Sequence, residues 1–387
     1  MFRFNPVFAS LPTSIFQHMT GLAVQYDAIN LGQGFPDQDG PLALREVAAK
    51  ALIDGPNQYP PSKGLAVLRE AVSAHARQFY GLDYDPEDEV VVTSGGTEAL
   101  GAAILAMAVP GEEFVLIEPT YDSYRPIVEA TGAVVKTVKL AAPGWRLTEE
   151  ALRAAIGPRT RAVLINSPHN PAGRVFSRAE METLAKVVSG TGAVVICDEV
   201  YEHLVFDGLA HIPLATLPGM RERCLRIGSA GKIFSFTGWK VGWVMGPRAL
   251  AAAAFRAHQF ITFTTPPALQ LGVAHGLGHA MDFPLALAAR LQKNRDALAD
   301  GLARMGFAVQ PCEGTYFLTA GISGLTGERD FDFCERLIRE AGVALIPLSS
   351  FFKGGTPDTF VRFAFCKQQD VIEQSLERLS WYLGQGS

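Results

Sequence analysis

The sequence predicts an α/β protein with two parts: a large domain built on a mostly parallel, mixed sheet between helices, and a smaller α+β domain. Short Val/Ile-rich runs alternate with helical patterns through most of the chain, as strands do when helices cover both faces of a sheet. After about residue 282 this alternation is replaced by a long helical stretch, which is followed by a few strands and helices. At 387 residues the chain is long enough for two domains.

The apolar runs expected to form strands of the large domain lie at 90–93, 114–117, 134–138, 162–166, 193–198, 224–228 and 241–245. Helical patterns lie between several of them, and one over 177–188 opens with Ser177 and Glu180 in capping-box spacing. In the smaller domain we expect helices over 285–305, 331–341 and 371–383, with strands near 316–319 and 360–365. The predicted boundaries are 1–43 for an N-terminal arm with part of the small domain, 44–282 for the large domain and 283–387 for the small domain.

Composition and charge exclude several classes of function. The net charge of −5 and the pI near 5.9 argue against nucleic acid or an anionic membrane as a partner. The five cysteines are scattered without metal-ligand spacing, so we expect neither disulfides nor a metal site, and a cytoplasmic location. No apolar run is long enough to span a bilayer.

Polar residues that could carry chemistry follow three of the predicted strands. They lie at 166–171, 198–201 and 229–232. In a parallel sheet, ligands bind outside the carboxyl ends of the strands. The sequence therefore predicts that these three segments meet at one site.

Two residues in these segments suit a covalently bound cofactor. Lys232 follows an apolar strand, and burial would lower the pKa of its amine and make it nucleophilic, as Schiff-base chemistry requires. A surface lysine in a loop is the alternative. Asp198 ends an apolar run, so its carboxylate should be buried and need a partner such as a protonated pyridine nitrogen. The alternative is that Asp198 caps a following helix.

Two further features could bind anionic groups. Residues 94–97, Ser-Gly-Gly-Thr, connect a strand to a helix, and the backbone N–H groups at a helix start suit a phosphate. An ordinary tight turn is the alternative. Arg362 has apolar neighbours in a predicted strand, where its guanidinium would pair with a buried protein carboxylate or bind a ligand carboxylate through two nitrogens. An exposed strand face remains the alternative.

The segment 228–243, Gly-Ser-Ala-Gly-Lys-Ile-Phe-Ser-Phe-Thr-Gly-Trp-Lys-Val-Gly-Trp, resembles the cofactor-lysine segment of class I aminotransferases, which have fold type I of the pyridoxal-phosphate enzymes. Residues 170–173 and 198–201 are similar to two other signatures of that family. The resemblance extends from about residue 16 to 379. It is strongest to the branch that contains methionine aminotransferase and the glutamine and kynurenine transaminases, through the segments 30–37, 57–59, 119–124, 312–317 and 346–348.

The resemblance implies pyridoxal 5′-phosphate as the cofactor, held as a Schiff base on Lys232, which would also carry the proton in catalysis. Asp198 would pair with the pyridine nitrogen, and Tyr201 and Asn170 would hydrogen-bond the ring 3-oxygen. The other implied cofactor contacts are Tyr121 on the ring face and, around the phosphate, Gly95, Gly96, Thr97, Ser229, Lys240 and Tyr59 of the partner subunit.

The same resemblance implies a homodimer that transfers an amino group from an L-amino acid to a 2-oxo acid by a ping-pong mechanism. Arg362 would bind the substrate carboxylate, helped by Asn170 and the backbone of Gly34. Phe16 and Phe263 would add apolar surface, and the segment 257–267 lacks the Arg that dicarboxylate-specific relatives carry there. We therefore expect neutral donors, methionine first, then glutamine, aromatic amino acids and kynurenine.

Two other functions fit parts of the sequence. A lyase that cleaves the C–S bond of cystathionine or other cysteine S-conjugates would share every cofactor contact. A cofactor-sensing regulator would bind without turnover, but such regulators carry a DNA-binding domain before the aminotransferase-like one. We expect none here, because little chain precedes the resemblance.

Overall fold

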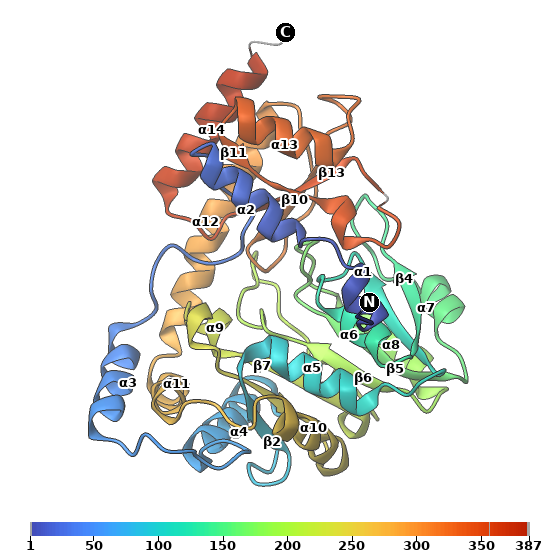
Figure 1. Ribbon diagram of the computed structural model, residues 1–387, viewed down its shortest axis with the longest axis vertical. Helices are drawn as coiled ribbons and strands as arrows, with labels where there is room; N and C mark the ends of the chain where they lie inside the picture. The colour runs from blue at the N-terminus through green and yellow to red at the C-terminus, as the bar shows by residue number, and fades with distance from the viewer. Residues whose placement is uncertain (1, 356, 385–387) are drawn as a thin grey trace.

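The computed structural model describes residues 2–355 and 357–384, and its larger part is built on a seven-stranded sheet (Figure 1). The strand order is β2-β8-β7-β6-β5-β3-β4, and only β8 runs antiparallel to its neighbours. The strands are β2 (Val90–Thr93), β3 (Glu113–Glu118), β4 (Val134–Lys139), β5 (Thr160–Asn166), β6 (Val194–Asp198), β7 (Cys224–Ser229) and β8 (Gly242–Met245). The mostly parallel, mixed α/β sheet confirms the predicted fold class.

Helices cover this sheet, and α5 (Gly95–Met107) packs against its central strands β6, β7 and β8. The central strands are buried along most of their length, which explains their unalternated apolar sequences. The other helices of this part are α3 (Leu42–Asp54), α4 (Ala66–Tyr80), α6 (Tyr124–Ala130), α7 (Glu149–Ala155), α8 (Arg178–Ser189), α9 (Ala230–Ile233), α10 (Arg248–Ile261) and α11 (Pro267–His279). The predicted capping box is present at the start of α8, where Ser177 and Glu180 bond each other's backbone N–H groups.

The C-terminal part is smaller and is built on an antiparallel sheet of order β12-β13-β10-β9. Its strands are β9 (Ala308–Val309), β10 (Phe317–Gly321), β12 (Ile346–Pro347) and β13 (Phe360–Ala364). The long helix α12 (Asp282–Arg304) leads into it, and α13 (Asp330–Glu340) and α14 (Gln369–Gly384) pack around it at the top of Figure 1. These helices and the longer strands lie within a few residues of their predicted positions.

The N-terminal segment lies with the C-terminal part of the chain. After α1 (Pro6–Ser10) and α2 (Ile15–Gln25), the strand β1 (Ile29–Asn30) pairs in parallel with β11 (Val343–Ala344). Helix α2 packs against α13, and Figure 1 shows both in the upper half of the molecule. Two-residue strands such as β1 and β11 carry no periodic signal, so they could not be predicted from sequence.

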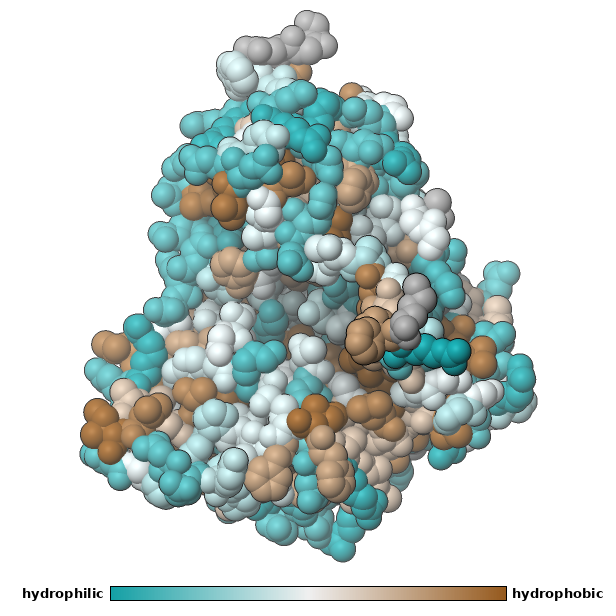
Figure 2. Space-filling view, viewed as in Figure 1, coloured by the Kyte–Doolittle hydropathy of each residue, from teal (hydrophilic) through white to brown (hydrophobic). Residues whose placement is uncertain are grey.

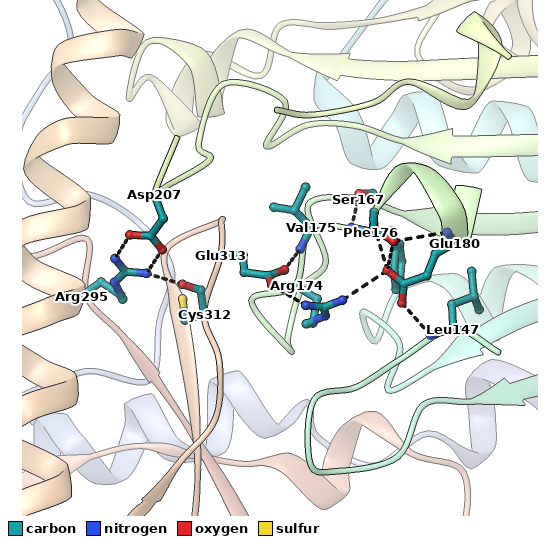
Figure 3. Close-up of polar contacts among 11 residues, drawn as sticks. Leu147, Ser167, Arg174, Val175, Phe176, Glu180, Asp207, Arg295, Cys312 and Glu313 are labelled. Carbon is teal, nitrogen blue, oxygen red and sulfur yellow. Dashed lines mark hydrogen bonds and ion pairs between the residues drawn. The ribbon is translucent and has the colours of Figure 1, made fainter. Parts of the chain in front are cut away.

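Ion pairs join the C-terminal part to the loops of the larger sheet (Figure 3). Arg295 on α12 donates to both carboxylate oxygens of Asp207 at 2.7 Å and to the Cys312 carbonyl at 2.5 Å. Arg174 pairs with Glu313 and with Glu180, the latter at 3.2 Å. These pairs fix the loops beside the carboxyl ends of the strands. Within the described ranges, no helix is both long and apolar enough to cross a membrane.

Candidate active site

A cavity of about 410 Å³ lies at the carboxyl ends of β5, β6 and β7, between the two parts of the molecule. Figure 2 shows the recess between the upper and lower parts on this face. Nearly all the predicted site residues line the cavity: Phe16, Gly34, Gly95, Gly96, Thr97, Tyr121, Asn170, Asp198, Tyr201, Ser229, Lys232, Lys240 and Arg362. The fold therefore brings together residues that are more than 300 positions apart.

Two predicted site residues lie away from the cavity of their own chain. Tyr59 and Phe263 pack against each other with ring centroids 5.3 Å apart. Their exposed fractions are 82% and 42%. Tyr59 was expected to act from a partner subunit, and its exposure is compatible with that expectation.

Lys232 sits on α9, directly after β7, and its amine faces the cavity. Its Nζ donates to the Tyr316 hydroxyl at 2.6 Å, and that hydroxyl donates to the Gly34 carbonyl at 2.9 Å. Burial lowers the pKa of Lys232 to about 8. About a tenth of the amine is therefore neutral, and hence nucleophilic, at pH 7, far more than for an ordinary lysine. The alternative of an exposed loop lysine does not hold.

Asp198 ends β6, and its carboxylate points into the cavity from a buried position. Burial raises its pKa to about 6, even though the Tyr124 hydroxyl and the Val200 N–H donate to it. Among the described residues, no helix begins directly after Asp198, so the alternative that Asp198 caps a helix does not hold. A cationic N–H group in the cavity would complete the hydrogen bonding of this carboxylate and lower its pKa.

The N-terminus of α5 forms the anion-binding end of the cavity. The helix begins at Gly95, whose φ of 79° is in the left-handed region that favours glycine. A Cβ atom at Gly95 would lie 3.4 Å from the Cα of Lys240, an ordinary contact, so the left-handed φ rather than a lack of space requires the glycine. Thr97 and Ser229 line the same end. Backbone N–H groups, the helix dipole and an ammonium group together suit a phosphate.

Arg362 lies on β13, lines the cavity from the C-terminal part of the chain and is fully buried. One of its terminal nitrogens donates to Asn170 Oδ1 and the other to the Gly32 carbonyl, both at 2.8 Å. Burial lowers its pKa to about 10, so the guanidinium stays charged at neutral pH. No protein carboxylate forms an ion pair with Arg362 among the described residues, which leaves the group able to bind a ligand carboxylate.

Three residues of the site were not singled out from the sequence. Tyr124 supports Asp198, and Tyr316 holds the amine of Lys232. Asn166 donates to the Asp198 carbonyl at 2.9 Å and accepts from the Asn170 N–H at 2.6 Å, which ties two site segments together. Tyr124 and Tyr316 lie within the segments 119–124 and 312–317. The resemblance of these segments to known aminotransferases was the one sequence feature that could have pointed to them.

Comparison with known proteins agrees with this geometry. The family described as aminotransferase class I and II matches residues 26–379, which is most of the chain. The chain belongs to this family. Pyridoxal 5′-phosphate is therefore its cofactor, and the enzyme is an aminotransferase whose substrates are amino acids and 2-oxo acids.

The relatives include enzymes with different substrates. A probable N-succinyldiaminopimelate aminotransferase of Mycobacterium tuberculosis is 45% identical over 95% of this chain and 96% of that protein. A solved structure of N-succinyldiaminopimelate aminotransferase from that organism has a TM-score of 0.95 and covers 99% of this chain and all of that one. The methionine aminotransferase of Escherichia coli is 39% identical over 95% of this chain and 96% of that protein. A kynurenine–oxoglutarate transaminase of Dictyostelium discoideum is 35% identical over 96% of this chain and 94% of that protein.

The cavity fits the cofactor on this structure's own evidence. It brings together a buried carboxylate that needs a cationic partner, a helix N-terminus with a lysine beside it, and a nucleophilic amine. These are the groups that a pyridinium nitrogen, a phosphate and an aldehyde require. The predicted fold type I is confirmed as well, because the similar solved structures are aminotransferases.

Proposed function

We propose that this aminotransferase takes the amino group of a neutral L-amino acid, methionine first, and transfers it to a 2-oxo acid. Glutamine, aromatic amino acids and kynurenine are the further donors. The observation that carries the proposal is the cavity lining near Arg362. It includes the aromatic side chains of Phe16, Phe35, Tyr121 and Phe317 beside the polar Asn170 and Gln33. Among the described lining residues Arg362 is the one cation beyond the two lysines assigned to the cofactor.

The proposed chemistry divides between the cofactor and the chain. Pyridoxal phosphate supplies an aldehyde that accepts the amino group and a ring that takes up the electron pair released at the substrate Cα. Lys232 Nζ holds the cofactor and, once free, carries the proton removed from Cα. Asp198 keeps the ring nitrogen protonated, because its buried carboxylate favours a cationic partner.

Orientation is the second task of the site. Tyr201 and Asn170 lie in the cavity where they would hold the ring oxygen, and Tyr121 would pack on the ring face. Arg362 would bind the substrate carboxylate through its planar guanidinium and thereby direct the Cα–H bond toward Lys232. Hydrogen bonds to Asn170 and Gly32 hold the guanidinium in one orientation before substrate arrives.

N-succinyldiaminopimelate transamination is a second candidate. It is favoured by the 45% identity to a protein with that printed function, against 39% for the methionine aminotransferase. That substrate is longer and carries additional carboxylates, so it needs cationic groups beyond Arg362. A carbon–sulfur lyase acting on cysteine S-conjugates is a third candidate, because it would use the same cofactor contacts.

A donor panel on the purified, cofactor-loaded enzyme tests the proposal. We expect kcat/KM to be highest for methionine, lower for glutamine, phenylalanine and kynurenine, and lowest for aspartate, whose second carboxylate would enter an apolar wall. N-succinyldiaminopimelate is assayed alongside, and pyruvate release from cystathionine measures lyase activity. A higher kcat/KM for aspartate or for N-succinyldiaminopimelate would refute the methionine preference, and pyruvate release that outpaces transamination would favour the lyase.

A further inference from the structure

A buried polar cluster links α4 to the turn after β6 and to β7. It contains His75 on α4, Glu199, Glu202 and His203 in the turn that follows β6, and Arg226 on β7. All except His203 are buried. None of these side chains lines the active-site cavity. The cluster is therefore separate from the cofactor site, although Asp198 and Tyr201 belong to the same turn segment.

Three side chains of this cluster converge on one point. The ligand atoms of His75, Glu202 and His203 all lie within 4.8 Å of one another. The two imidazole Nε2 atoms are 2.7 Å apart. His75 and His203 are 128 positions apart in the sequence, so no local spacing could have revealed them.

The surroundings hold these side chains in place. Glu202 accepts a hydrogen bond from Arg226 at 3.4 Å, and the Arg226 guanidinium also binds Glu199 at 2.6 Å. The ring of Phe79 packs against both imidazoles with centroid distances of 4.8 Å. A hydrogen-bonded carboxylate is one of the supports that metal ligands have in proteins, whereas the buried Nδ1 of His75 has no hydrogen-bond partner among the described residues.

Burial also keeps both imidazoles in the form that binds metal. It lowers the pKa of His75 to about 3 and that of His203 to about 4, so each ring is neutral at neutral pH. Glu199 and Glu202 both contact the Arg226 guanidinium, and His211 lies 3.3 Å from Glu199, so Glu202 is the carboxylate that the two imidazoles share. A cation placed beside Glu202 would find an electrostatically favourable position.

We propose that His75, Glu202 and His203 form a binding site for a divalent metal ion of the zinc class. Two imidazoles and one carboxylate are a ligand set typical of Zn²⁺, with the fourth position open to water or another small ligand. His203 is only partly buried, which gives the ion a route from solvent. Two imidazole nitrogens bound to one tetrahedral zinc lie about 3.3 Å apart, so the pair needs to separate by roughly half an ångström.

The proposed ion would tie α4 to the turn that carries Asp198 and Tyr201. Its binding should stabilise the folded protein, since a ligand that binds only the native state raises the midpoint of thermal unfolding. The alternative is that the two histidines simply share a hydrogen bond between neutral rings. In that case metal should have no specific effect on the protein.

The test uses the cofactor-loaded enzyme after treatment with a chelator. Zn²⁺ is added in a calorimetric titration, and the metal retained after dialysis is measured. We expect one equivalent per chain, a higher unfolding temperature with Zn²⁺, and, with Co²⁺, visible d–d absorption of a four-coordinate nitrogen and oxygen site. His203→Gln should weaken Zn²⁺ binding about 100-fold or more, because even residues that only support a metal ligand are worth 10–100-fold.

The matched control is His279→Gln. His279 and His275 lie one helical turn apart on α11 with ring centroids 4.8 Å apart, so they could bind zinc at the surface. Retained binding in His279→Gln together with its loss in His203→Gln supports the proposal. The reverse result, or no stoichiometric binding by the parent enzyme, overturns it. If His203→Gln does not fold, X-ray absorption of the zinc bound to His279→Gln decides, because the surface pair is then broken and fewer than two imidazole ligands would contradict the site.

Discussion

At the scale of single residues, the hydroxyl of Tyr316 determines where the amine of Lys232 lies. It accepts a hydrogen bond from Nζ and donates one to the Gly34 carbonyl, which fixes its own direction. An oxygen that accepts from an ammonium group stabilises the charged form of the lysine. Burial acts in the opposite sense and lowers the pKa to about 8. Tyr316 is therefore a positioning residue for the group that must carry the proton.

Replacing Tyr316 with Phe should change both the rate and its pH dependence. The amine would lose its hydrogen-bond acceptor, so its pKa should fall further. The rising limb of the pH profile of kcat should then move to lower pH by about one unit, since a pKa unit corresponds to about 1.4 kcal/mol. We also expect kcat to fall roughly tenfold, because a hydrogen bond to a charged group is worth about 1.5–3 kcal/mol. The measurement is kcat from pH 5 to 10 with methionine as donor.

The control for this prediction is Tyr382→Phe. The Tyr382 hydroxyl bonds Arg336 and Glu340 at the surface of the C-terminal part, away from the cavity. Its removal should leave the pH profile unchanged. If Tyr316→Phe lowers kcat at every pH by the same factor without moving the limb, Tyr316 has only a structural role.

At the scale of elements, the backbone conformation at the start of α5 determines how the cofactor phosphate can bind. Gly95 and Gly81, at the end of α4, both have a left-handed backbone, with φ of 79° and 66°. They differ in their neighbours, because a Cβ atom would contact Lys240 at Gly95 and no atom within 4 Å at Gly81. An L-residue in this region costs about 1–2 kcal/mol. Gly95→Ala and Gly81→Ala should thus both lower the free energy of unfolding, by about 1 kcal/mol each, in urea titrations of the cofactor-free protein.

Only Gly95→Ala should also weaken pyridoxal phosphate binding. An alanine at Gly95 relaxes away from the left-handed φ of 79°, and that relaxation would shift the N–H groups that suit the phosphate. We expect the Kd for pyridoxal phosphate, from fluorescence titration, to rise about tenfold, the equivalent of one lost charge-assisted hydrogen bond. Equal affinities in Gly95→Ala and Gly81→Ala would show that the phosphate does not bind at this helix start.

The elements also show what the sequence could and could not predict. Strands such as β5 and β6 were predictable because both their faces are buried and their sequences are continuously apolar. The positions of Asp198 and Lys232 followed from the rule that ligands bind at the carboxyl ends of parallel strands. Tyr316 was not assigned a role, because it reaches Lys232 only through the packing of the C-terminal part against the sheet. Long-range contacts of this kind leave no periodic trace.

At the scale of the whole molecule, several large apolar side chains are exposed on one side of the larger part. Leu52 and Ile53 on α3 and Phe260 on α10 are between 55% and 86% exposed, together with Tyr59 at 82%. Figure 2 shows apolar side chains over α3 and α10 on this face. Exposed aromatic and aliphatic groups of this size are typical of a subunit interface. We therefore infer a homodimer in which Tyr59 of one subunit reaches the phosphate of the other.

Mixing two inactive variants tests the shared site directly. Lys232→Ala removes the proton carrier, and Tyr59→Ala removes the proposed contact from the partner subunit. In a mixed dimer, one site combines Lys232 from the second variant with Tyr59 from the first and is complete, while the other lacks both. Random exchange gives half mixed dimers, and one of the two sites in each is complete. About a quarter of the parent activity should therefore return at a cofactor concentration too low for the Tyr59→Ala dimer.

Lys232→Ala mixed with Tyr382→Ala is the control, since Tyr382 lies away from the cavity. The activity of that mixture should not exceed the activity of the same amount of Tyr382→Ala protein assayed alone. If the Tyr59→Ala mixture also regains nothing while mass measurements confirm dimers, then each site is complete within one chain, and Tyr59 stabilises the surface where it lies beside Phe263.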